Sequence, residues 1–386
     1  MTRPRTSFAL RASLLLVLGG SFTLGTLRSV LGEDPAPPGL DPAQTLGPDT
    51  QQSEQQGCIK CHEPHYAAWR KSTHAGSLAM PREPLARSLR RALRRQADGF
   101  RPNTSPLCMS CHFTVIESKG ELKAAYGVSC ESCHGAGGAH VALHSDKQAD
   151  YATRMQAATD AGMIRPTSLY RLAENCYQCH MLAKDVNRAE GEPTLEELVN
   201  LEVEVKEKGQ ESTVHHPAGT LEFDLLTYSQ GEVRHNFNDG KPNPPSAYRH
   251  ALYVVGKLLD LEFSLRALAR ATDAEGTYYT SIRSRLEGER GAPAALRAVR
   301  GVLPDDLPLA QTIDGCLEAL GTTDLGVEKH DATLAAAEKV RELAQQAFPE
   351  RSPEELAEFE AKLAAVPGLT ALLPTEVKGE ADGGGK

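Results

Sequence analysis

Four copies of the pentapeptide Cys-x-x-Cys-His dominate the sequence, and they use eight of its nine cysteines. Cysteines three residues apart lie on one face of a helical turn, so each pair can form thioether bonds to the two vinyl groups of one haem. The histidine that follows can bind the iron, which is the attachment pattern of a c-type haem. The sequence therefore predicts four covalently attached haem c groups. In chain order the four units are Cys58–Cys61–His62, Cys108–Cys111–His112, Cys130–Cys133–His134 and Cys176–Cys179–His180.

Two other uses of these cysteines are structural zinc and disulfides. Four Cys-x-x-Cys pairs could form two zinc sites of four thiolates each, and paired cysteines are common in exported chains. Neither use requires a histidine directly after every second cysteine, whereas all four units have one. A disulfide between cysteines three residues apart is also strained. Haem is the favoured interpretation.

The N-terminus has the pattern of a secretory signal. Residues 1–32 contain a basic start and the apolar, small-residue segment Ala12–Leu27, with small residues before Glu33 for cleavage. A retained N-terminal anchor is the alternative. Residues 33–56, rich in Pro, Gly, Asp and Gln, are expected to form a flexible leader. We therefore predict a periplasmic protein with no membrane span after signal cleavage.

The charge of the chain limits its partners. The 42 basic and 51 acidic residues give a net charge of −9, and loss of the four arginines in residues 1–32 would make it −13. An acidic surface disfavours nucleic acid as a partner. Redox proteins, either other cytochromes or a multihaem oxidoreductase, are the expected partners.

Nine histidines lie outside the attachment units, and four irons each have a sixth coordination position to fill. His74, twelve residues after His62, is too near for its own haem but is well placed for a neighbouring one. His140 follows a glycine-rich turn, and His144 is expected at the surface. The remaining candidates are His235 and, more weakly, His216. No histidine closely follows the second unit, so its haem is the first candidate for an open position. Methionine ligation is the less favoured alternative, from Met80, Met155 or Met163.

An arginine-rich segment lies between the first and second units. Seven arginines occur from Arg82 to Arg101, and Leu85, Leu89 and Leu93 recur at helical spacing. The pattern predicts an amphipathic helix. Its basic face could simply be solvated, could compensate haem propionates, or could dock an acidic redox partner.

These motifs resemble the cytochrome c-554 family of tetrahaem electron carriers over residues 57–240. The resemblance rests on the four units, on Trp69-x-x-Ser72-x-His74, on Cys-Glu-Ser-Cys-His-Gly with His140, and on the His216-Pro and Arg-His235-Asn-Phe segments. Members are similar in haem stacking to multihaem enzymes such as hydroxylamine oxidoreductase. The resemblance implies distal ligands at His74, His140 and His235 and a five-coordinate, high-spin second haem at His112. His216 is additional to that ligand set.

The pattern changes after a proline-rich linker at residues 241–245. Leu252, Val255, Leu259 and Phe263 share a helical face, and Leu309, Ile313, Cys316 and Leu320 form another, so Cys316 is expected to be a buried free thiol. We therefore predict a mainly α fold with little regular β structure: a tetrahaem domain (57–240), an α-helical bundle domain (246–370) and a disordered tail (371–386). The helical domain could cover the haem domain, mediate homo-oligomerisation or bind a partner.

Three functional hypotheses follow. The favoured one is periplasmic electron transfer through stacked, mostly bis-histidine haems. The second is a haem enzyme that reduces or oxidises a small nitrogen species, such as nitric oxide, at a five-coordinate haem of His112. The third is a haem-bearing scaffold within a larger respiratory complex. Whether His216 fills the position at His112 discriminates the first two.

Overall fold

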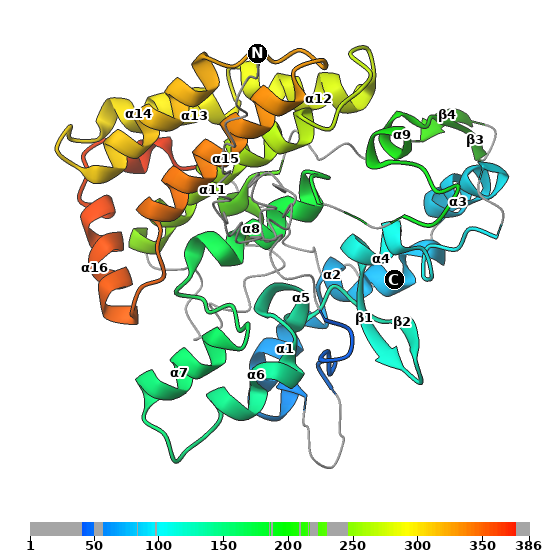
Figure 1. Cartoon of the computed structure of the whole chain (residues 1–386), viewed down its shortest axis with the longest axis horizontal. Helices are drawn as coiled ribbons and strands as arrows, with labels where there is room; N and C mark the ends of the chain where they lie inside the picture. Colours follow the sequence, from blue (N-terminus) through cyan, green and yellow to red (C-terminus); the bar gives the residue numbers. More distant parts are fainter. Residues whose placement is uncertain are drawn as a thin grey trace, which may run out of the picture. The chain divides into compact units, whose positions relative to one another are not determined.

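The computed structural model describes residues 41–49, 57–82, 84–96, 99–184, 186, 188–207, 210–214, 216, 223–229 and 246–375. Across these ranges the chain is mainly helical with two small sheets (Figure 1), which confirms the predicted mainly α class. The elements up to the second sheet are η1 (Cys58–Lys60), α1 (Glu63–Trp69), α2 (Thr73–Gly76), η2 (Ser77–Arg82), α3 (Pro84–Gln96), α4 (Pro106–His112), β1 (Phe113–Ser118), β2 (Glu121–Gly127), α5 (Cys130–His134), α6 (Gly137–His144), α7 (Tyr151–Asp160), α8 (Leu169–His180), α9 (Leu195–Asn200), β3 (Val203–Glu207) and β4 (Gln210–Val214). They are followed by α10 (Leu225–Ser229), α11 (Ser246–Leu268), α12 (Thr277–Glu287), α13 (Ala292–Val302), α14 (Pro308–Gly321), α15 (His330–Ala347), α16 (Pro353–Ala364) and η4 (Leu369–Leu372).

A β-hairpin joins the second attachment unit to the third. Strand β1 begins directly after His112 and pairs antiparallel with β2. The turn between them places Lys119 and Gly120 at φ 57° and 77°, the left-handed backbone that a tight two-residue hairpin turn requires. At the open end of the hairpin, the Thr114 hydroxyl donates to the Gly127 carbonyl at 2.8 Å, and the Ser129 amide donates to that hydroxyl at 3.0 Å. These bonds hold the start of α5 beside the end of α4.

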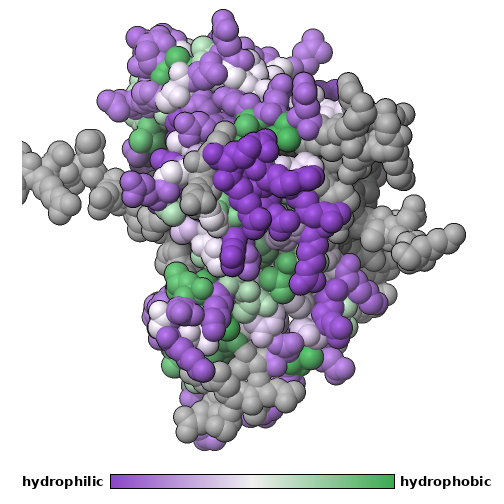
Figure 2. Space-filling view, turned by 90° about the vertical axis from the view of Figure 1, so that its right-hand side faces the viewer, coloured by the Kyte–Doolittle hydropathy of each residue, from purple (hydrophilic) through white to green (hydrophobic). Residues whose placement is uncertain are grey.

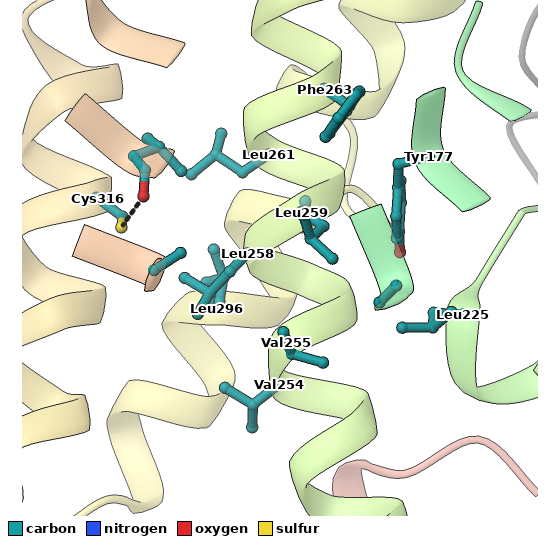
Figure 3. Packing of buried hydrophobic residues seen from close by; sticks show 14 of the residues in the cluster. Tyr177, Leu225, Val254, Val255, Leu258, Leu259, Leu261, Phe263, Leu296 and Cys316 are labelled. Atoms are coloured by element: carbon teal, nitrogen blue, oxygen red, sulfur yellow. Dashed lines mark hydrogen bonds between the residues drawn. The ribbon is translucent and has the colours of Figure 1, made fainter. Parts of the chain in front are cut away.

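The largest hydrophobic core surrounds α11. Helix α11 packs against α8 on one side and against α13 and α15 on the other, and α14 packs against α13 and α15. Figure 3 shows Tyr177 and Leu296 on either side of α11, and Cys316 farther out on α14. The Tyr177 hydroxyl also donates to the Gly256 carbonyl at 2.7 Å. Helix α8 carries the fourth Cys-x-x-Cys-His unit, so the C-terminal helices and the helix of that unit share one core. The predicted domain boundary at residues 241–245 lies outside the described residues.

Two helices begin at capping boxes, in which a side chain at the helix start and one three residues later each accept a hydrogen bond from a backbone amide. Thr194 and Glu197 form a capping box at the start of α9, and Ser352 and Glu355 form one at the start of α16. Cys316 is a free thiol with no exposed surface, as expected.

Two terminal segments are more ordered than their composition predicts. Residues 41–49 belong to the expected flexible leader. Two of their backbone carbonyls nevertheless accept hydrogen bonds, that of Pro42 from the Glu117 amide and that of Gln44 from the Gly138 amide. Residues 371–375 belong to the expected disordered tail, yet Leu372 and Leu373 pack against the main core. The predicted signal, residues 1–32, and the chain from Glu376 onward lie outside the described residues. Within the described part of the chain, no helix is long and apolar enough to span a bilayer.

Candidate haem attachment sites

Three of the four attachment units form the C-terminal ends of helices. Helices α4, α5 and α8 end at His112, His134 and His180, and the first unit lies in the 3-10 helix η1 and the turn after it. A helical turn places cysteines at i and i+3 on one face, with the histidine next to the second cysteine. The local folding therefore gives each unit the arrangement that covalent haem attachment needs.

The cysteines are free in the described structure. None of the nine forms a disulfide, and among the described residues no three or more His, Cys, Asp or Glu side chains cluster as ligands for a metal ion. A haem iron takes at most two ligands from the protein, both axial. A haem site is therefore not expected to produce such a cluster.

Three pairs of imidazoles provide a test of whether haem fits. A metal–imidazole bond is about 2 Å long. Two imidazoles that bind one iron from opposite sides would therefore have their ligating nitrogens about 4 Å apart and their ring centroids farther apart, at roughly 6 Å. The structure places His62 and His144 at 6.4 Å, His74 and His180 at 6.1 Å, and His112 and His216 at 6.0 Å. Each pair joins one attachment-unit histidine to one histidine from elsewhere, so these residues fit the group.

Burial keeps the imidazoles of His112 and His180 neutral, which is the form that binds iron. It lowers the pKa of His112 to about 4, and the neighbouring His216 contributes to this lowering. Burial, followed by the presence of His74 and His112, lowers the pKa of His180 to about 4 as well. At neutral pH both rings therefore have a free lone pair.

The histidine of the third unit is held by a backbone carbonyl. The Nδ1 atom of His134 lies 2.9 Å from the Ile164 carbonyl, so Nδ1–H donates and Nε2 keeps its lone pair. This is the usual way in which a ligating histidine is oriented. Gly135 follows at φ 88°, and a side chain there would clash with the Gly162 carbonyl. The tight bend after His134 therefore requires glycine.

The predicted ligand His140 is 7% exposed and is held in a similar way. Its Nε2 lies 3.2 Å from the Gly135 carbonyl, and its Nδ1 is buried with no hydrogen-bond partner among the described residues. A lone pair so placed is available to a metal. Its role as a distal ligand stays a prediction, as does that of His235, which lies outside the described residues.

The sequence patterns do not point to two histidines that the structure brings to the units. His144, expected at the surface, is half-buried and faces His62, while its own Nδ1 donates to the His140 carbonyl at 3.1 Å. Burial lowers the pKa of His134, and the nearby His65 lowers it further. The signals available in the sequence are the i, i+4 spacing of His140 and His144 and the position of His65 three residues after His62. Neither spacing reveals which iron a ring can reach.

The four units contact one another in series. The thiols of Cys58 and Cys130 are close enough to shift each other's pKa, so the first unit lies beside the third. The Asn175 side chain, in the fourth-unit helix, donates to the carbonyl of the third unit's second cysteine at 3.0 Å. The thiols of Cys111 and Cys179 are likewise close enough to shift each other's pKa, so the second unit lies beside the fourth. Through these contacts the units lie in the order first, third, fourth, second.

Comparison with known families agrees with this site. Residues 57–135 match the family model described as cytochrome c554 and c-prime. This segment, about a fifth of the chain, holds the first three units, and the fourth lies beyond it. The match supports the resemblance over residues 57–135, and this part of the chain is similar to c-type haem cytochromes of that family. No curated protein and no solved structure matches the chain.

Proposed function

We propose, from the premise that residues 57–135 are a cytochrome c554-type segment, that the whole chain is a periplasmic tetrahaem cytochrome that carries electrons between redox proteins. The fourth unit, Cys176–His180, has the same sequence pattern and the same helix-end position as the second and third. This equivalence supports a count of four haems.

The observation that carries the proposal is the set of three imidazole pairs at 6.0–6.4 Å. The pairs involve the histidines of the first, fourth and second units. When bound, each haem would supply an iron that exchanges one electron without making or breaking a bond. Two imidazole ligands keep such an iron low-spin in both oxidation states. The chain's contribution is to hold neutral imidazoles at the separation that this ligation requires.

The contact series of the units supports transfer over a distance rather than chemistry at one centre. Each unit lies beside the next through residues of the attachment helices or turns. The Lys184 ammonium, four residues past His180, also donates to the Ser110 carbonyl of the second unit at 2.9 Å. These contacts bring neighbouring units together within one compact unit of the chain.

The rival hypothesis of a nitrogen-oxide enzyme needs an open position at His112. The His216 ring lies 6.0 Å from the His112 ring, at an interplanar angle of 74°. Because rings on opposite sides of an iron can have any relative rotation, this pair favours a filled sixth position. The electron carrier is therefore the better supported function.

Spectroscopy of the purified ferric protein tests the proposal. We expect low-spin electron paramagnetic resonance signals only, and no carbon monoxide binding after reduction. His216→Ala should convert one haem in four to a high-spin, carbon monoxide-binding form, whereas the exposed His330→Ala should leave the spectra unchanged. If the unmodified protein already has a high-spin, ligand-binding haem and His216→Ala creates no further one, the assignment of His216 is overturned and the enzyme hypothesis is restored.

Haem count and location have separate tests. The intact mass of the mature chain should exceed the polypeptide mass by four haems, and the protein should be found in the periplasmic fraction, starting at Glu33. A mass excess of three haems, or a cytoplasmic location, would contradict the corresponding part of the proposal.

A further inference from the structure

Helix α3 and its flanks carry a charge opposite to that of the whole chain. From Arg82 to Arg101 there are seven arginines against two acidic residues, a net charge of +5 in a protein whose net charge is −9. The predicted helix forms over Pro84–Gln96. The basic charge is therefore concentrated on one element rather than spread over the surface.

The arginines at positions 87, 91 and 95 follow one another at i, i+4 spacing on the same helix face, and all three are exposed. Like charges at this spacing destabilise a helix by a few tenths of a kcal/mol per pair, about 0.2–0.5 kcal/mol. Their hydrogen bonds do not offset this effect, since Arg91 donates only to the Ser88 hydroxyl at 3.2 Å. The stripe Arg87–Arg91–Arg95 has no evident structural role.

No carboxylate pairs with the arginines of α3 within the part of the chain that the structure describes. Arg94 donates to the Phe100 carbonyl at 2.9 Å, which closes the turn after the helix and leaves the guanidinium exposed. Figure 2 shows the molecule from the right-hand side of Figure 1, which is the side where α3 lies. The most hydrophilic residues gather near the centre of this view. The positive charge is thus available to a partner.

The opposite face of α3 packs against the second attachment unit. Leu93 forms a buried cluster with Phe100, Leu107 and Leu198, and Cys108 packs against this cluster. A helix with its side chains is about 10–12 Å thick. The arginine stripe is therefore separated from the second unit by roughly one helix, and that unit is one end of the contact series.

We propose that the stripe Arg87–Arg91–Arg95 is the docking site for an acidic one-electron redox protein, which exchanges electrons at the second attachment unit. This inference rests on the proposed electron-transfer function and names the chemistry of its partner. In each productive encounter one electron moves between the partner and the iron held by His112. One protein is oxidised by one electron, the other is reduced by one, and no bond or proton is exchanged.

Charge and position together select this partner. The rest of an acidic chain repels an acidic protein, so a local basic stripe orients the encounter and raises its rate by about 10-fold to 1000-fold at low salt. An anionic membrane or a nucleic acid would also be attracted, but neither delivers a redox centre to the second unit. A redox protein uses both features of the site.

The experiment uses the full-length holoprotein and a reduced, acidic plant-type ferredoxin as the probe, with electron transfer followed by stopped-flow absorbance. The test variant is Arg87→Gln/Arg91→Gln/Arg95→Gln. The matched control, Arg290→Gln/Arg297→Gln/Lys329→Gln, removes three exposed positive charges from the C-terminal helical region. We expect the second-order rate constant at low salt to fall about tenfold in the test variant and less than twofold in the control. The salt dependence of the rate should also become shallower only in the test variant.

Equal rates and equal salt dependence in the two variants would overturn the docking site. Unchanged rates with a shifted reduction potential would overturn it as well, because they would show that the arginines compensate haem propionates. Reduction by dithionite separates this proposal from the proposed function. If dithionite reduces every haem, a failed salt test refutes only the docking site. If dithionite leaves the haems oxidised, the carrier function itself is refuted.

Discussion

Glu131 lies inside the third attachment unit, between Cys130 and Cys133, and its carboxylate joins three parts of the chain. It is 2% exposed. Its Oε1 accepts from the amides of Leu46 at 2.9 Å and Gly137 at 2.7 Å, and its Oε2 accepts from the amide of Gly47 at 2.7 Å. The carboxylate therefore ties residues 41–49 and the start of α6 to the haem-attachment helix α5.

Glu131→Gln should destabilise the protein by about 3 kcal/mol. A hydrogen bond to a charged group contributes about 1.5–3 kcal/mol, and a neutral one about 0.5–1.5 kcal/mol. Glutamine keeps one carbonyl oxygen for two of the donors, but its amino group faces the third amide, which then has no acceptor. Two bonds are weakened and one is replaced by a donor facing a donor.

Urea unfolding followed by far-ultraviolet circular dichroism measures this loss, with the exposed Glu121→Gln as the control. Amide hydrogen exchange adds local information, because about 3 kcal/mol corresponds to about a hundredfold loss of protection. That loss should appear at Leu46 and Gly47, whose amides bond to the carboxylate. A destabilisation below about 0.5 kcal/mol, the usual effect of a surface substitution, would refute the role given to Glu131.

Three further predictions concern the helical core. Leu258→Ala, at a fully buried position of α11, should cost about 2–5 kcal/mol in urea unfolding, whereas Leu122→Ala, at a residue 53% exposed, should cost little; equal costs would contradict the assigned core. Arg285→Met should cost about 3–5 kcal/mol because it leaves Asp260 buried without its partner at 2.6 Å, and adding Asp260→Asn should recover part of the loss; no recovery would argue against the pair. Burial raises the pKa of Glu360 from 4.5 to about 7, so its stabilising contribution is complete below about pH 4.5 and is lost as the pH rises through about 7. We compare the free energy of unfolding of Glu360→Gln with that of the unmodified protein in urea. The difference in favour of Glu360→Gln should be larger at pH 8 than at pH 5, by up to about 3 kcal/mol. Identical pH profiles of the two proteins would refute this.

Features that depend on neighbours in the sequence are the ones that sequence patterns predict well. The four attachment units, the helix over the arginine-rich segment, the capping boxes of α9 and α16 and the burial of Cys316 are all local patterns. Their physical basis is helical geometry, which brings residues three or four positions apart onto one face. Such patterns are largely independent of where the segment lies in the fold.

The pairing of imidazoles cannot be predicted in this way. Nothing in the local sequence of His144 requires burial, yet α6 carries its ring to within 6.4 Å of the His62 ring, 82 positions earlier in the chain. Residues 41–49 look flexible in composition, yet Glu131 supplies acceptors for their amides. In both cases the partner is distant in sequence.

The sequence alone therefore determined the attachment chemistry, the helical class and the sign of the charge on α3, because covalent ligands, helical periodicity and formal charge are local properties. Only the tertiary structure decided that His216 faces His112, that the units contact in the order first, third, fourth, second, and that α3 packs against the second unit. Each of these depends on the packing of segments that are far apart in the chain, and packing is a property of the whole folded molecule.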